Sequence, residues 1–415
     1  MTMHDVISDE RRVRGPGLQV LVGRVPSRGV TFDVGYISAE RSPALFPCRH
    51  LRRARSFAAI GCALVLFGLT ACHSTAPITS LQRFEFAELH MATVFRIVLY
   101  APDETTANHS AEAAFRRIAQ LDDVLTDYDQ NSELMRLGRQ PVGRPVPVSR
   151  ELFAVLQKSQ KLAARTDGAF DMTVGPLVQL WRASRKSHVL PDAGQIAEAK
   201  RACGYRNIAL NARNRTVVLK VPHMRLDAGG IAKGYAADEA LQLLRQMGTP
   251  RALVAASGDI ATGDAPPGRP GWNVGIESID APLTGLSRSV ILRHAGISTS
   301  GDTEQYVEID GRRYSHIVNP ATGLGLTERI GVTIIAPNST DSDRLATAVS
   351  VLGAAKGLAF IESQSACAAL IVTLTNGGTQ VLESRRFPRL TGAPAARDSQ
   401  PKAPESSSAR TLPVR

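Results

Sequence analysis

The chain has 415 residues, of which 43% are hydrophobic, so it is long enough to bury one large core or two modest ones. Its net charge of +11 would suit a nucleic-acid-binding protein, but the excess charge lies at the two ends. Residues 1–71 carry a net charge of +5 and residues 389–415 one of +3, which leaves only +3 for residues 72–388. The middle of the chain shows no basic stripe with interleaved aromatic residues. This distribution argues against nucleic acid as a partner.

The N-terminal segment has the pattern of an export signal. Four arginines between Arg49 and Arg55 precede an apolar run, residues 57–69, that is too short to span a bilayer. The run ends in Leu69-Thr-Ala-Cys72, which resembles the lipobox of bacterial lipoproteins and predicts a lipid anchor at Cys72; a signal peptide with an incidental cysteine is the alternative. We expect residues 1–71 to be leader and signal peptide, residues 72–83 a spacer, and the mature protein to be exported and membrane-anchored, facing the periplasm.

Cysteine use sets a limit on covalent cross-linking. Removal of the leader and modification of Cys72 would leave Cys203 and Cys367, too few for a disulfide framework. The sequence leaves open whether these two pair.

Apolar periodicity predicts an α+β domain over residues 84–388, followed by a Pro-, Ala- and Ser-rich tail, residues 389–415, typical of disorder. The expected strands are 84–100 (interrupted at 90–93), 207–210, 217–221, 223–226, 253–256, 272–276, 289–292, 306–309, 330–335, 370–374 and 379–382. The expected helices are 111–125, a short one from residue 132, 151–164, one after residue 230, and 341–352.

The stretch Leu226-Asp-Ala-Gly-Gly-Ile-Ala-Lys-Gly-Tyr235 is the strongest candidate for a binding loop. Asp227 is placed to cap the following helix or to face the bend, and the paired glycines let a ligand approach the backbone. A helix N-terminus favours an anion, and a phosphate there would explain Lys233 in a first turn where the helix dipole disfavours a cation. The alternative is a tight strand-to-helix turn with a surface lysine. The spacing matches neither a P-loop nor a Rossmann fingerprint.

A second pair of candidates is Asp343 and Thr347, which lie four residues apart in an expected helix. That spacing stacks their oxygens on one face, as a Mg²⁺ site completed by water and phosphate would require. An acidic residue that merely balances the helix dipole is the alternative.

Further candidates are single residues. His316 precedes a rigid Asn-Pro turn and suits a general base, although a lone histidine is more often structural. Phe170 beside Asp171 is placed to cover an aromatic ring, and Tyr128 is either a stacking residue or the end of a helix. Two short segments, 257–259 and 298–302, read as strand-end loops rich in small donors.

Together these motifs resemble the FAD:protein FMN transferase (ApbE) family over residues 84–382. The segments that carry the resemblance occur in order: 170–176 (Phe-Asp-Met-Thr-Val-Gly-Pro), 226–235, 257–259 (Ser-Gly-Asp), 299–302 (Thr-Ser-Gly-Asp), 316–323 (His-Ile-Val-Asn-Pro-Ala-Thr-Gly), and Asp343 with Thr347.

The resemblance implies a two-lobed α+β fold with FAD and Mg²⁺ in a cleft between the lobes. By matching positions, it implies a flavin site lined by Met91, Tyr128, Ala169, Phe170, Asp171, Asp227, Lys233 and Ile317. It also implies a metal site formed by the side chains of Asp343 and Thr347 with Gly230, which as a glycine offers only its backbone carbonyl.

The implied reaction moves FMN from FAD to a Thr or Ser hydroxyl of another protein and releases AMP, with His316 as the base. The family's acceptor motif resembles Asp-x-x-Ser/Thr-Gly/Ser-Ala-Thr. Since this chain contains no such segment, we expect a separate exported acceptor. Two rivals remain: a Mg²⁺-dependent FAD pyrophosphatase and a flavin-binding carrier without chemistry.

Overall fold

The computed structural model of the protein describes residues 80–276, 288–301, 305–375 and 378–387. The expected leader, the lipidation site at Cys72 and the expected tail from residue 389 therefore lie outside the described residues. Cys203 and Cys367 are both free thiols in the structure.

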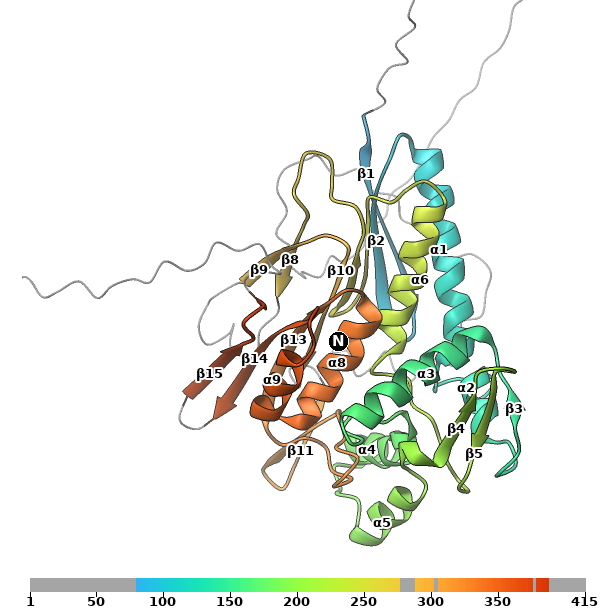
Figure 1. The fold of residues 1–415 in the computed structure, drawn as a ribbon. Helices are drawn as coiled ribbons and strands as arrows, with labels where there is room; N and C mark the ends of the chain where they lie inside the picture. Colours follow the sequence, from blue (N-terminus) through green and yellow to red (C-terminus); the bar gives the residue numbers. More distant parts are fainter. Residues whose placement is uncertain (1–79, 277–287, 302–304, 376–377, 388–415) are drawn as a thin grey trace, which may run out of the picture.

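An eight-stranded antiparallel sheet forms the centre of the molecule, in the order β1-β2-β6-β7-β10-β13-β14-β15 (Figure 1). Its strands are β1 (Gln82–His90), β2 (Thr93–Ala101), β6 (Ala252–Ala256), β7 (Asp259–Thr262), β10 (Ala295–Gly301), β13 (Arg329–Ala336), β14 (Ala368–Thr375) and β15 (Gly378–Glu383).

Both faces of this sheet are covered, which follows from the period-two pattern of its strands. On β2, Phe95, Ile97 and Leu99 belong to the main core, whereas Val98 belongs to a second cluster on the other face. Burying each such side chain stabilises the fold by about 1.5–3 kcal/mol. The main core packs against α1 (Glu104–Leu125), α6 (Ala232–Gln246), α8 (Ser339–Leu352) and α9 (Ala354–Glu362). The second cluster includes residues of the hairpin of β8 (Trp272–Ile276) and β9 (Arg288–Leu292).

The remaining elements gather at the lower end of the view in Figure 1. One group is α2 (Glu133–Gly138), α3 (Arg150–Arg165) and the small sheet of β3 (Val146–Pro147), β5 (Thr216–Leu219) and β4 (Ile208–Asn211). The other is α4 (Gly175–Ser187), α5 (Ala193–Arg201) and the hairpin of β11 (Tyr306–Ile309) and β12 (Arg312–Ser315), which share a third cluster around Leu177 and Trp181. The predicted α+β class is confirmed, while a flavin site in a cleft between lobes stays a prediction.

Several sequence expectations were wrong in detail. Residues 223–226 form no strand although Met224 and Leu226 are buried alternately, because no neighbouring strand pairs with them. The first helix begins at Glu104, seven residues before the expected start, because Asp103 caps it through the Thr106 amide at 2.8 Å. The expected loop at 298–301 is the end of β10, hydrogen-bonded to β13. Helices α4, α5 and α9 were not predicted.

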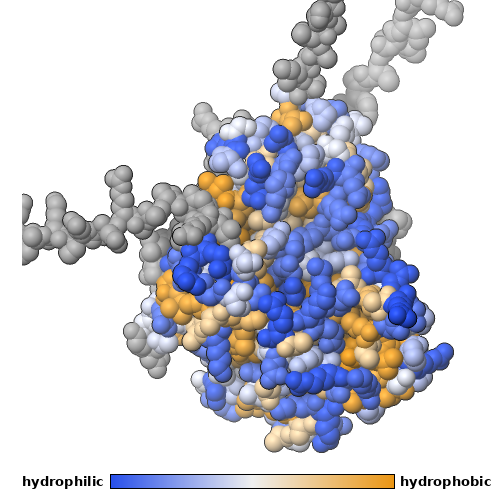
Figure 2. All heavy atoms as spheres, viewed as in Figure 1, coloured by the Kyte–Doolittle hydropathy of each residue, from blue (hydrophilic) through white to orange (hydrophobic). Residues whose placement is uncertain are grey.

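The molecular surface on the viewed face is mainly hydrophilic, with apolar side chains in separate patches (Figure 2). Among the described residues, no helix is both long and apolar enough to cross a bilayer.

Candidate functional site

The loop from Asp227 to Gly230 leads into α6. The Asp227 carboxylate accepts a hydrogen bond from the Gly229 amide at 2.7 Å, so it stabilises the bend rather than capping the helix. The N-cap position of α6 is Ile231, whose side chain makes no capping hydrogen bond. The amides of the first turn of α6 therefore depend on partners other than a capping side chain.

Helices α6 and α8 cross at two glycines of α6 and its preceding loop. A Cβ atom on Gly230 would lie 2.7 Å from the Thr347 hydroxyl oxygen, and one on Gly234 would lie 2.3 Å from the Ser339 carbonyl oxygen. The Gly234 amide donates to Asp343 Oδ2 at 3.0 Å. The crossing thus brings together Gly230, Asp343 and Thr347, the three residues implied as metal ligands.

Replacing Gly234 with alanine should lower the free energy of unfolding by about 1–3 kcal/mol, because the added methyl group overpacks this crossing. Gly275→Ala in β8 is the matched control, since a Cβ there meets no atom within 4 Å. Urea unfolding of both variants measures the difference. A Gly234→Ala protein as stable as the control would show that the two helices can accept a methyl group at this crossing without strain.

Lys233 and two carboxylates form the charged part of this crossing. The Lys233 ammonium pairs with the buried Asp259 carboxylate at the start of β7. Burial opposes the charge on Lys233, but Asp259 and Asp343 outweigh it and raise the pKa of Lys233. Burial, followed by the nearby charge of Asp259, raises the pKa of Asp343 to about 7. The crossing therefore holds a fixed cation beside a carboxylate whose negative charge is poorly solvated.

The oxygens at this crossing fit a hard cation. Among the described residues, no hydrogen-bond donor reaches Asp343 Oδ1 or the Thr347 hydroxyl, whereas Asp343 Oδ2 is held by Gly234. No cluster of three or more His, Cys, Asp or Glu side chains occurs in the described ranges. One carboxylate, one hydroxyl and one backbone carbonyl are ligands that Mg²⁺ accepts, since it usually keeps several waters and takes further oxygens from phosphate.

A second group of charges lies around Tyr128, next to Asp227. Arg182 of α4 donates to Asp127 Oδ2 at 2.6 Å, and its Nη2 lies 3.7 Å from Asp227 Oδ2. Its guanidinium carbon lies 4.4 Å from the centroid of the Tyr128 ring. Burial and the charge of Asp127 raise the pKa of Asp227, and the positive charge of Arg182 opposes this shift. Arg182 thus joins two implied flavin-site residues, Tyr128 and Asp227.

His316 follows β12 and is oriented by Gln305. The Gln305 carbonyl accepts from the His316 backbone amide at 3.0 Å and lies 3.1 Å from His316 Nδ1. A carbonyl accepts only, so Nδ1 carries the proton and the lone pair of the neutral ring is on Nε2. Arg185, one turn after Arg182 on α4, lies 3.5 Å from the Gln305 side-chain oxygen. Helix α4 therefore contacts both the Tyr128 group and the segment that orients His316.

The other implied flavin-site residues have clear structural roles. Met91 lies at the tip of the β1–β2 hairpin, where its amide donates to Asp122 at 2.9 Å. Phe170 is 4% exposed in the main core, Ala169 precedes it half-buried, and Ile317 is buried with its amide bonded to Ser315 Oγ. Their contact with flavin stays a prediction.

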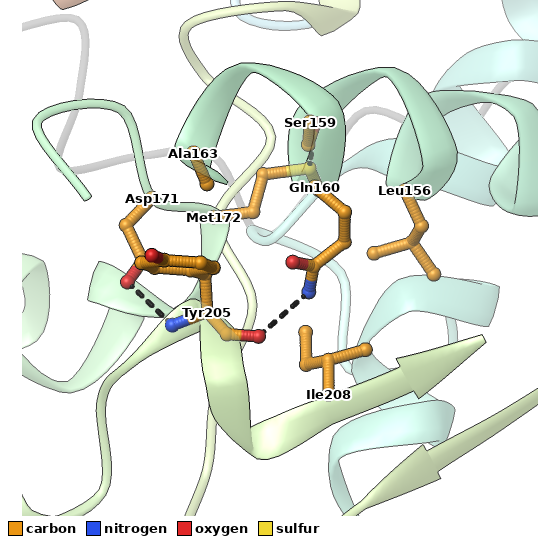
Figure 3. A pocket seen from close by; sticks show the side chains of 8 residues that line it. All are labelled: Leu156, Ser159, Gln160, Ala163, Asp171, Met172, Tyr205 and Ile208. Atoms are coloured by element: carbon orange, nitrogen blue, oxygen red, sulfur yellow. Dashed lines mark hydrogen bonds between the residues drawn. The ribbon is translucent and has the colours of Figure 1, made fainter. Parts of the chain in front are cut away.

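Asp171 lies in a different setting from the other candidates. One of its oxygens accepts from the amide and hydroxyl of Thr173, at 2.8 and 2.7 Å, and the other from the Tyr205 amide at 2.8 Å. It lines a small cavity with Met172, Tyr205 and Gln160 (Figure 3). Burial raises the pKa of Asp171, and these hydrogen bonds oppose the shift. The carboxylate organises the turn before α4.

Two residues of the site escaped the sequence interpretation. Asp259 lies in the Ser-Gly-Asp segment, but nothing in the sequence pairs it with Lys233, 26 residues away. Arg182 was missed because helix α4 was not predicted, although Leu177 and Trp181 have the spacing of one helix face. Both roles depend on tertiary contacts.

Comparisons with known proteins identify the family of the chain. The sequence model of the ApbE family matches residues 91–371. The chain belongs to the ApbE family. The ApbE match includes every candidate residue for catalysis, flavin binding and metal binding, from Met91 to Thr347.

Relatives that carry the name FAD:protein FMN transferase resemble the chain over most of their length. The protein from Treponema pallidum is 35% identical over 325 residues, which is 74% of this chain and 88% of the relative. One from Klebsiella pneumoniae is 32% identical over 292 residues, covering 70% and 89%.

Solved ApbE structures share the fold. The apo form of the flavinyl transferase ApbE from Pseudomonas stutzeri superposes with a TM-score of 0.68 at 28% identity, covering 76% of this chain and 99% of that one. The flavin transferase ApbE from Vibrio cholerae gives a TM-score of 0.68 at 26% identity, covering 74% and 99%.

Proposed function

We propose that the protein is an FAD:protein FMN transferase, which moves FMN from FAD to a Thr or Ser hydroxyl of an acceptor protein and releases AMP. The observation that carries this proposal is the crossing of α6 and α8, where Gly230, Lys233, Asp343 and Thr347 converge. The names of the ApbE relatives support the same reaction.

The crossing of α6 and α8 carries groups that can bind a pyrophosphate. In the first turn of α6 the Gly234 amide already donates to Asp343, so the attraction for a phosphate comes from the Lys233 ammonium and from the positive end of the helix dipole. Asp343 and Thr347, with the Gly230 carbonyl, would hold Mg²⁺ beside it. When bound, Mg²⁺ would stabilise the charge that develops on the phosphate oxygens.

His316 is the proposed base. Its Nε2 takes the proton of the acceptor hydroxyl as the oxygen attacks the phosphorus on the FMN side of FAD. The new oxygen–phosphorus bond forms, the pyrophosphate bond breaks, and AMP leaves with the electron pair. Lys233 stabilises the charge on the leaving phosphate.

The two rivals use parts of the same site. An FAD pyrophosphatase would use water as the nucleophile and release free FMN, whereas a carrier would bind FAD unchanged. Incubation of the protein with FAD, Mg²⁺ and a peptide that carries the acceptor motif, followed by chromatography, separates all three. We expect AMP to appear together with flavin bound to the peptide. Free FMN alone would favour the pyrophosphatase, and unchanged FAD the carrier.

The proposed location is the periplasmic side of a bacterial membrane, with an exported acceptor protein as partner. The Leu69-Thr-Ala-Cys72 segment after the basic and apolar leader supports it. A lipid on Cys72 would hold the enzyme at the surface on which an exported acceptor appears.

Replacing Cys72 with alanine should release the protein from the membrane fraction or block processing of its leader, because the lipid has no other attachment residue in the lipobox. Fractionation of cells that express each form, followed by mass measurement of the mature N-terminus, tests this. Unchanged processing and unchanged membrane retention of Cys72→Ala would refute the anchor.

A further inference from the structure

In the described part of the chain, Arg182 is the one residue of α4 whose side chain contacts Asp127, Tyr128 and Asp227. Its guanidinium bonds Asp127 at 2.6 Å and lies 4.4 Å from the centroid of the Tyr128 ring. At this distance a planar cation is attracted by the face of an aromatic ring. The three side chains therefore form one unit, which we call the Tyr128 clamp: Asp127, Tyr128 and Arg182.

The Tyr128 clamp leaves part of the ring open. Arg182 covers one face, yet Tyr128 remains 68% exposed, so its opposite face is available to solvent. The cation restricts the conformations of the Tyr128 side chain before a ligand binds. The exposed face of the ring is therefore preorganised for stacking.

The charges around Arg182 argue against a direct contact with phosphate. Its guanidinium lies between Asp127 and Asp227, so its positive charge is already offset by two carboxylates. Arg182 is thus suited to hold a neighbour in place.

We propose that Arg182 is a positioning residue that holds the Tyr128 ring so that its open face stacks on a planar ring of FAD. The inference rests on the proposed function and deepens it. FAD carries two planar rings, isoalloxazine and adenine, and both have the chemistry that this surface recognises. The binding of two fragments of the substrate shows which ring stacks on Tyr128, because FMN carries the isoalloxazine and AMP carries the adenine.

The test measures the affinity of FMN and of AMP, each alone, for five forms of the full chain: wild type, Arg182→Ala, Tyr128→Ala, the double variant and Arg182→Lys. We expect Arg182→Ala to weaken the binding of one fragment by about three- to tenfold and to leave the other unchanged. The double variant should lose no more affinity than Tyr128→Ala alone, because both changes remove one contact. Arg182→Lys should recover part of the loss, since it keeps the charge but not the planar group.

Two further measurements separate positioning from a general loss of structure. Arg182→Ala should raise the KM for FAD by a similar factor while kcat stays within twofold, and Tyr128→Phe should bind like wild type because the ring makes the contact. Arg165→Ala is the matched control, because Arg165 also covers an aromatic ring, that of Phe360 at 5.5 Å, away from the site.

Several results would overturn the inference. These are equal affinity of Arg182→Ala and wild type for both fragments, additive losses in the double variant, or the same loss in Arg165→Ala. If Arg182→Ala does not fold, Arg182→Lys and the Tyr128 variants decide by the same criteria. Failure of the wild type to bind FAD, FMN and AMP would instead contradict the proposed function.

Discussion

Replacing His316 with asparagine should slow flavin transfer to an acceptor peptide by about 10²–10⁴-fold, the usual cost of removing a general base. FAD affinity should stay within a few-fold of wild type, because the groups proposed to hold the pyrophosphate and the metal belong to α6, its preceding loop and α8, whereas His316 follows β12. The asparagine amide can still donate to the Gln305 carbonyl that orients the histidine ring. The substitution therefore removes the base and keeps the local hydrogen bond.

The pH dependence gives a second readout for this variant. The defect should shrink as the pH rises, because hydroxide partly substitutes for the missing base. His294→Asn is the matched control: His294 lies 3.0 Å from Asp264 on the surface, and its φ of 51° is one that asparagine tolerates. If His316→Asn loses FAD binding and transfer to the same degree, the histidine belongs to the binding site and the proposed mechanism is wrong.

Replacing Asp343 with alanine should abolish most of the activity, by about 10²-fold or more, because a catalytic metal ion stabilises several kcal/mol of developing charge. Loss of the Asp343 charge should itself cost little stability, because burial and the nearby Asp259 already disfavour the ionised carboxylate. Removal of the acceptor for the Gly234 amide adds about 1–3 kcal/mol. The measurement is the transferase activity of each protein as a function of Mg²⁺ concentration.

A second variant separates the metal from the fold at this position. Asp343→Asn keeps an acceptor for the Gly234 amide but removes the negative charge. The variant should therefore be as stable as wild type but need a much higher Mg²⁺ concentration for activity. Asp341→Asn, two residues earlier in α8 and paired with Arg344, is the control for the charge of the helix start. Full activity of the wild type in excess EDTA would rule out the metal role.

The sequence predicted the elements in which one local pattern dominates. Alternation placed Phe95, Ile97 and Leu99 on one face of β2, and helical spacing placed Asp343 and Thr347 on one side of α8. Both patterns depend on periods of the backbone itself. The Gly229-Gly230 pair likewise marked the entry to α6.

The sequence failed where distant contacts decide. The segment before Asp227 alternates in burial like a strand, yet it has no strand beside it. Helix α4 does have an apolar face, with buried Leu177 and Trp181 four residues apart, which the sequence interpretation did not use. Arg182 became visible only with its partners Asp127 and Asp227. The pairing of Lys233 with Asp259 joins a helix to a strand, and no local pattern encodes that contact.

The most direct test of the central claim is the mass of an acceptor peptide after incubation with the purified protein, FAD and Mg²⁺. The transferase account predicts a peptide heavier by one phosphoester-linked FMN, an equal amount of released AMP, and no change in a peptide whose acceptor threonine is alanine. An unmodified threonine peptide accompanied by free FMN and AMP at full rate would contradict it.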